Sequence, residues 1–187
     1  MANMNVRTPR FYPDLINFIL SRGVAQGGNF DVVATDASAY LMGTFTTGSE
    51  AELFDMKPLN KVTFDTSADT DGHVLITLDL QGSYKKSFVA ILNHNMVSAD
   101  AQVIIAASAT ESHIQVANMG SATAIQPTEV VNGDTINGSS PYDVAPDTDG
   151  STIIKFAESG LRYWGIQFEG NSSNTFSSTD LFIGCIM

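Results

Sequence analysis

The feature that most constrains this fold is a two-residue alternation of apolar and polar side chains, repeated in short segments from residue 30 onward. In the segment 73–80, Val74, Ile76 and Leu78 fall on one face of an extended chain, while Thr77 and Asp79 fall on the other. This period is typical of a β-strand with one buried and one solvated face. The segment 162–169 repeats it, and 88–92 is continuously apolar, as expected of a central strand covered on both faces.

About ten segments of this kind follow one another at the spacing typical of antiparallel folds. We expect strands at 30–34, 41–46, 61–65, 73–80, 88–92, 102–107, 113–117, 151–156, 162–169 and 181–186. Since no helical pattern separates them, a parallel α/β fold is disfavoured. The chain is therefore predicted to be all-β, an antiparallel β-sandwich or jelly roll with a short N-terminal helix.

The alternation also predicts the core. The side chains expected inside are Val74, Ile76, Leu78, Leu92, Trp164, Ile166 and Phe168. The side chains of Tyr163, Gln167 and Glu169 are expected to face outward. The segment 120–150 is poor in large apolar residues and rich in turn residues, so we expect a long irregular loop there.

The first 22 residues differ chemically from the rest. They carry three arginines against one aspartate, a net charge of +2. Since the whole chain has a net charge of −11, residues 23–187 carry −13. Within them, 13–22 begins with a proline and ends before a glycine, as a short helix does. Its apolar residues point in too many directions for a solvated helix, so we expect it to be buried on more than one side, by its own domain or by a neighbour. We therefore divide the chain into an assembly segment, 1–22, and a jelly-roll domain, 23–187.

We expect the assembly segment to dock on a neighbouring subunit or on a second copy of the chain, because it is basic and the rest is acidic. The candidate assembly residues are Arg7, Arg10, Phe11, Tyr12 and Phe18.

Composition excludes several classes of partner and site. A net charge of −11 repels a phosphate backbone, so no nucleic-acid partner is expected. No apolar run has the roughly 20 residues that span a bilayer, and the N-terminus lacks the apolar middle of a signal peptide, so no membrane partner is expected. The single Cys185 has no partner for a disulfide or a zinc site.

No catalytic residue, cofactor or metal is predicted, and the chain is not expected to be an enzyme. The sequence Asp-Thr-Asp-Gly occurs at 69–72 and 147–150, but neither loop fits the spacing of an EF-hand, so hairpin turns of type I′ are preferred. His73, His94 and His113 share no local ligand spacing and are expected to be neutral and hydrogen-bonded. The nucleophile motif Gly-x-Ser-x-Gly is absent.

Two segments carry a resemblance to a known family. The sequence FVAILNHNM at 88–96 and the sequence RYWGIQF at 162–168, closed by LFIG at 181–184, resemble blocks in virion proteins of tailed bacteriophages with a discoidin-like (galactose-binding-like) jelly roll. The resemblance implies a noncatalytic structural protein of the virion, a tail or baseplate component or a head decoration protein. Its partners would be other virion proteins and further copies of itself.

The alternative is a carbohydrate-binding module that recognises glycans of the host surface. Such a module is expected to group two or three exposed Trp or Tyr side chains at loop tips. The chain has one Trp, which the alternation places inward, and no sugar-binding residue can be matched to the family.

Overall fold

A computed structural model describes residues 15–16, 30–33, 45–68, 72–115, 119–135, 142–171 and 175–187, with 30–33 as backbone alone. These residues form an antiparallel β-sandwich, which confirms the predicted all-β class. Leu15 and Ile16 are helical, and the rest of the predicted helix 13–22 lies outside the described residues. No helix in this part of the chain is long and apolar enough to cross a membrane.

The elements follow one another along the chain as short strands with two 3-10 helices. They are β1 (Phe30–Val33), β2 (Phe45–Thr47), η1 (Glu50–Phe54), β3 (Val62–Phe64), β4 (Val74–Asp79), β5 (Lys86–His94), β6 (Ala101–Ser108), η2 (Glu111–His113), β7 (Thr123–Ala124), β8 (Pro127–Val131), β9 (Gly133–Thr135), β10 (Val144–Pro146), β11 (Gly150–Ser159), β12 (Tyr163–Gly170), β13 (Phe182–Ile183) and β14 (Cys185–Ile186).

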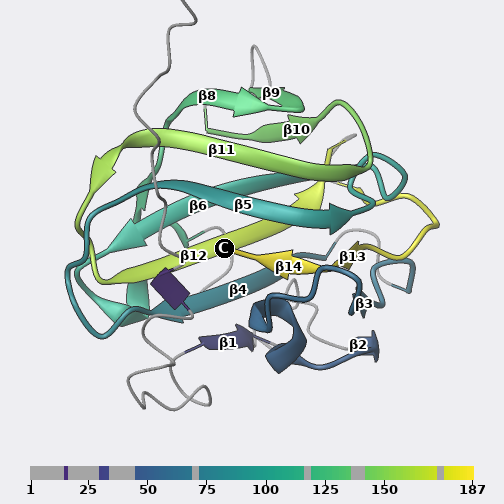
Figure 1. The fold of residues 1–187 in the computed structure, drawn as a ribbon, viewed down its shortest axis with the longest axis horizontal. Helices are drawn as coiled ribbons and strands as arrows, with labels where there is room; N and C mark the ends of the chain where they lie inside the picture. The colour runs from purple at the N-terminus through teal and green to yellow at the C-terminus, as the bar shows by residue number, and fades with distance from the viewer. Residues whose placement is uncertain are drawn as a thin grey trace, which may run out of the picture.

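Two sheets make the sandwich (Figure 1). Within the described residues, the larger sheet has the order β1-β4-β12-β6-β10-β9, with β7 also paired to β6. The second has the order β14-β5-β11-β8, and Figure 1 shows β5 and β11 crossing in front of β12 and β6. A small third sheet, β13-β3-β2, lies beside them.

The core fills the space between the sheets, largely as the alternation predicts. Six of the seven predicted core side chains are buried: Val74, Ile76, Leu78, Trp164, Ile166 and Phe168. The exception is Leu92, which is half-buried. It pairs with Ser151 on β11 and with Cys185 on β14, and it lies on the opposite face of β5 from its fully buried neighbour Ile91.

The prediction that β4 and β12 have one wet face is wrong. Thr77, Gln167 and Glu169 are buried, and only Tyr163 and Asp79 are partly exposed on that side. A second apolar cluster of Leu75, Ala106 and Met119 covers the outer face of the larger sheet. Met119 packs where Gly165 has no side chain, because a Cβ there would lie 2.2 Å from the Met119 sulfur. Alternation within one strand cannot reveal this cover, which comes from a distant loop.

The segment 120–150 is not the irregular loop that its composition predicts, since it contains β7, β8, β9 and β10. These strands are short and half-exposed, so they show little apolar alternation. The strand predicted at 113–117 is also wrong, because 111–113 forms η2. The strand predicted at 181–186 is broken at Gly184, where a Cβ would lie 2.0 Å from the Pro58 carbonyl oxygen.

Replacing Trp164 tests the core. Trp164 is 2% exposed and packs on Phe156 with ring centroids 5.5 Å apart. Trp164→Ala should lower the free energy of unfolding by about 3–5 kcal/mol, because a large buried side chain is lost. The matched control is Leu59→Ala at an 88% exposed position, expected to change stability by less than about 0.5 kcal/mol. Denaturant melts measure both, and a loss below about 1 kcal/mol for Trp164→Ala would contradict this placement.

Candidate functional site

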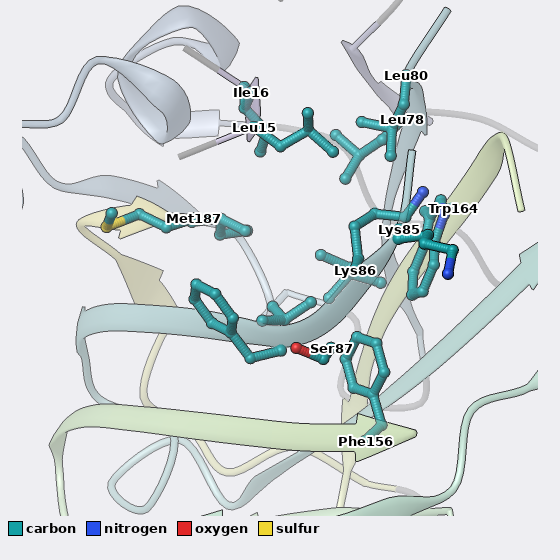
Figure 2. A pocket seen from close by; sticks show the side chains of 14 residues that line it. Leu15, Ile16, Leu78, Leu80, Lys85, Lys86, Ser87, Phe156, Trp164 and Met187 are labelled. Carbon is teal, nitrogen blue, oxygen red and sulfur yellow. The ribbon is translucent and has the colours of Figure 1, made fainter. Parts of the chain in front are cut away.

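A cavity of about 180 Å³ opens between the two sheets, where β5 begins (Figure 2). Its walls are mostly apolar, and the side chains that line it come from both sheets and from the N-terminal segment. In Figure 2, Leu15 and Ile16 lie opposite Phe156, and Lys86 lies beside Trp164. The cavity is thus closed on one side by residues far away in sequence.

Lys86 is a charged residue of the cavity wall whose amine is fixed by two contacts. Its Nζ donates a hydrogen bond to the Leu161 carbonyl at 2.7 Å and lies 4.8 Å from the centre of the Trp164 ring. Burial lowers the pKa of Lys86 to about 8, because desolvation disfavours the charged amine. At neutral pH the amine is still mostly protonated. The neighbouring Lys85 is exposed and pairs with Glu158 at 2.6 Å.

The Leu161 carbonyl lies between the cavity and the neighbouring protein surface. It accepts hydrogen bonds from Lys86 and from Trp164 Nε1, the latter at 2.8 Å. Arg162 follows and turns outward, where its Nε and Nη2 donate to the two carboxylate oxygens of Asp79 at 2.6 and 2.7 Å. The turn before β12 is therefore fixed from both sides.

Asp79 organises the surface around this turn. It also accepts hydrogen bonds from the backbone and the side-chain amide of Gln81. Burial alone would raise the pKa of Asp79, but the hydrogen bonds from Arg162 and Gln81 outweigh it, so the pKa is lowered and the carboxylate stays ionised. The Arg162 guanidinium lies 4.8 Å from the centre of the Tyr163 ring.

Tyr84 completes a group of planar side chains at this end of the sandwich. It is 38% exposed and lies in the loop between β4 and β5. This loop lies beside the turn before β12, since the Lys85–Glu158 ion pair joins β11 to it and Gly160 approaches the Ser83 carbonyl. We call these five residues the rim cluster: Asp79, Gln81, Tyr84, Arg162 and Tyr163.

His94, at the end of β5, is a neutral, buried side chain, as predicted. Its Nδ1 must accept, because it faces the backbone N–H of Met96 at 3.3 Å, which can only donate. The proton therefore resides on Nε2, which donates to Thr152 Oγ1 at 3.0 Å. Burial lowers the pKa of His94, and the charge of Asp149 partly opposes this. Protonation would break the bond to Met96 and bury a charge.

This arrangement predicts a pH-dependent stability. A histidine whose pKa is lower in the folded state stabilises the fold above its unfolded pKa of about 6.5 and loses that contribution as the pH falls. The free energy of unfolding should therefore decrease between pH 7.5 and 5.5. The decrease should be smaller in His94→Gln, which keeps a donor for Thr152 but cannot titrate. Equal pH slopes in denaturant melts of the two proteins would contradict the assignment.

The other two histidines also have partners. His73 Nε2 lies 3.2 Å from Glu169 Oε2, and His113 Nδ1 lies 3.0 Å from Ser108 Oγ. In the described part of the chain, no group of three His, Cys, Asp or Glu side chains is placed to hold a metal ion. Cys185 is buried, and its thiol donates to the Ile186 carbonyl oxygen at 3.7 Å.

The prediction of a type I′ hairpin at 147–150 is wrong. The strands on either side, β10 and β11, belong to different sheets, and Gly150 has a φ of +132° while Asp149 has no positive φ. Asp149 instead accepts hydrogen bonds from the backbone of Val97 and from the backbone and hydroxyl of Ser98. The loop therefore carries the chain from one sheet to the other. Of the other Asp-Thr-Asp-Gly copy, 69–71 lies outside the described residues.

The predicted assembly residues Arg7, Arg10, Phe11, Tyr12 and Phe18 also lie outside the described residues, so docking through 1–22 stays a prediction. The two described residues of that segment pack on the chain's own core: Ile16 is 5% exposed, and Leu15 contacts the same cluster.

Sequence reasoning identified Arg162 and Tyr163 only as the start of a strand and missed Asp79, Lys86 and Tyr84 as members of a site. Nothing in the local sequence marks them, because β12 lies far along the chain from β4 and β5. The available indication was that Asp79 and Arg162 each stand at the end of an alternating strand. Antiparallel pairing of those strands brings them together.

Comparison with known proteins gives a structural likeness alone. No protein-family model matches the chain, and no curated protein is significantly similar to it. Among solved structures, the chain is similar to CBM32-1 from a family 31 glycoside hydrolase of Clostridium perfringens, with a TM-score of 0.50 and 12% identity over 85% of this chain and 92% of that one.

Two further structures are more distant. The chitosan-binding module 1 of a chitosanase/glucanase from Paenibacillus sp. IK-5 has a TM-score of 0.47 and 13% identity, covering 76% of this chain and 89% of that one. The CBM32 of AlyQ, in complex with 4,5-unsaturated mannuronic acid, has a TM-score of 0.46 and 17% identity, covering 84% of this chain and 95% of that one. The likeness to CBM32-1 shows that the fold is a CBM32-like antiparallel β-sandwich, the discoidin-like fold that the resemblance implied.

Proposed function

We propose that the chain is a noncatalytic carbohydrate-binding module and that the rim cluster is its sugar-binding surface. This was the alternative at the level of sequence. The observation that carries it is the bidentate Asp79–Arg162 pair, which lies beside the Tyr163 ring at the end of the sandwich where the loop with the exposed Tyr84 also lies. The fold shared with CBM32-1 of Clostridium perfringens supports the proposal.

The chemistry of the rim cluster suits a sugar ring. A sugar presents hydroxyl groups that both donate and accept, together with an apolar face of C–H groups. Charged planar side chains form strong hydrogen bonds with paired hydroxyls, and an aromatic ring packs against the C–H face. Arg162 uses Nε and Nη2 for Asp79, and Nη1 has no hydrogen-bond partner among the described residues. Since Asp79 holds the guanidinium, little side-chain entropy remains to be lost on binding.

The test replaces the exposed ring and leaves the Asp79–Arg162 pair intact. A screen on a glycan array should find a ligand, and Tyr84→Ala should weaken its binding about tenfold, measured by calorimetry. Leu59→Ala is the matched control, because Leu59 is exposed near the far end of β5, where Asn93 bonds to the Pro58 carbonyl. Absence of any glycan ligand, or equal losses in both variants, would contradict the proposal. Release of reducing ends from the bound glycan would contradict its noncatalytic part.

A second candidate is a noncatalytic structural role in a tailed-phage virion, suggested by the sequence resemblance. One observation favours a protein contact: Met56 and Leu59, only three residues apart, are 46% and 88% exposed. Exposed apolar side chains grouped in one loop are typical of interfaces. In this role the chain would assemble with other virion proteins and with further copies of itself.

This candidate has a separate test. A chain carrying Leu59→Asp should fail to sediment with phage particles, while the unaltered chain should be found with either the head or the tail fraction after disruption. Tyr84→Ala should sediment like the unaltered chain. Recovery of the unaltered chain only as free protein would exclude the virion role.

A further inference from the structure

The cavity between the sheets is a second feature with binding capacity, distinct from the rim cluster. Protein cores are close-packed and hold few voids larger than a water molecule. This cavity measures about 180 Å³, and an engineered apolar cavity of roughly 150 Å³ holds a benzene molecule. Leu78, Leu80, Val89 and Phe156 form much of its wall. It therefore has room for an apolar group of about six to eight carbons.

The mouth of the cavity carries a positive charge without an anionic partner. The Lys86 amine is half-buried and is held by the Leu161 carbonyl and the Trp164 ring. Among the described residues no carboxylate pairs with it, whereas its neighbour Lys85 pairs with Glu158. A half-buried ammonium without a counter-ion is costly, so an anion at this point would be strongly favoured. Lys85 also lines the cavity, but its charge is already paired with Glu158.

We propose that the cavity binds a small aliphatic carboxylate, with the alkyl chain between the sheets and the carboxylate paired with the Lys86 amine. The apolar wall selects the chain, because its burial removes alkyl surface from water. The Lys86 amine selects the sign of the head group, since an ammonium would be repelled there. This inference does not rest on the proposed sugar binding, because it uses the cavity and Lys86 rather than the rim cluster.

The unaltered protein can be tested directly, because Trp164 is the only Trp of the chain and lines the cavity. Octanoate, octylamine and octanol, each below its micellar concentration, would be titrated at pH 7 while Trp164 fluorescence is recorded. Octanoate should give a saturable change, and octylamine should bind at least about tenfold more weakly. No saturable change with octanoate, or equal binding of octanoate and octylamine, would overturn the proposal.

Two lysine variants locate the head group. Lys86→Gln should weaken the binding of octanoate about tenfold, because the charge that pairs with the carboxylate is removed. The affinity for octanol should stay within about twofold of that of the unaltered protein. Lys85→Gln is the matched control, because Lys85 is exposed and already paired, and it should weaken octanoate far less. Equal effects of the two variants on octanoate would overturn the assignment to Lys86. Tyr84→Ala should leave octanoate binding unchanged, which separates this site from the rim cluster.

Discussion

The pairing of β12 with both of its neighbours is the constraint on which the rest of the structure depends. Its eight residues pair with β6 without a break, from Tyr163↔Ser108 to Gly170↔Ala101, and with β4 from Tyr163↔Asp79 to Phe168↔Val74. Because side chains alternate along a strand, this register alone places Trp164 in the core and Glu169 on the opposite face. A slip of one residue would bury a carboxylate in the apolar core, which costs several kcal/mol.

The outer face of the larger sheet strengthens that register. Glu169 is buried there and accepts hydrogen bonds from Gln102 at 2.5 Å and from Gln167 at 3.0 Å, with His73 at 3.2 Å. Burial alone would raise the pKa of Glu169, but these partners outweigh it and the pKa is lowered. A buried polar group is tolerated when its hydrogen bonds are satisfied. This cluster therefore fits only one alignment of β4, β6 and β12, whereas apolar contacts tolerate several.

The same register also positions the polar side chains around the turn that precedes β12. The Leu161 carbonyl holds Lys86 at the cavity, and the next residue, Arg162, turns to Asp79 on the surface. An apolar cavity with a cation and a polar surface with an exposed ring thus lie on two sides of one turn. A rigid turn of this kind limits the entropy lost by a ligand's partners on binding.

The sequence by itself determined the all-β class, most of the strands and six of seven core side chains, because these follow from alternation within a single strand. It also indicated that His94 is neutral. The cover over Thr77 and Gln167, the strands within 120–150 and the break at Gly184 were decided by tertiary structure. So were the rim cluster and the cavity. Each of these depends on residues that are distant in the chain and adjacent only after the strands pair, and a pattern of period two carries no information about which strand lies beside which.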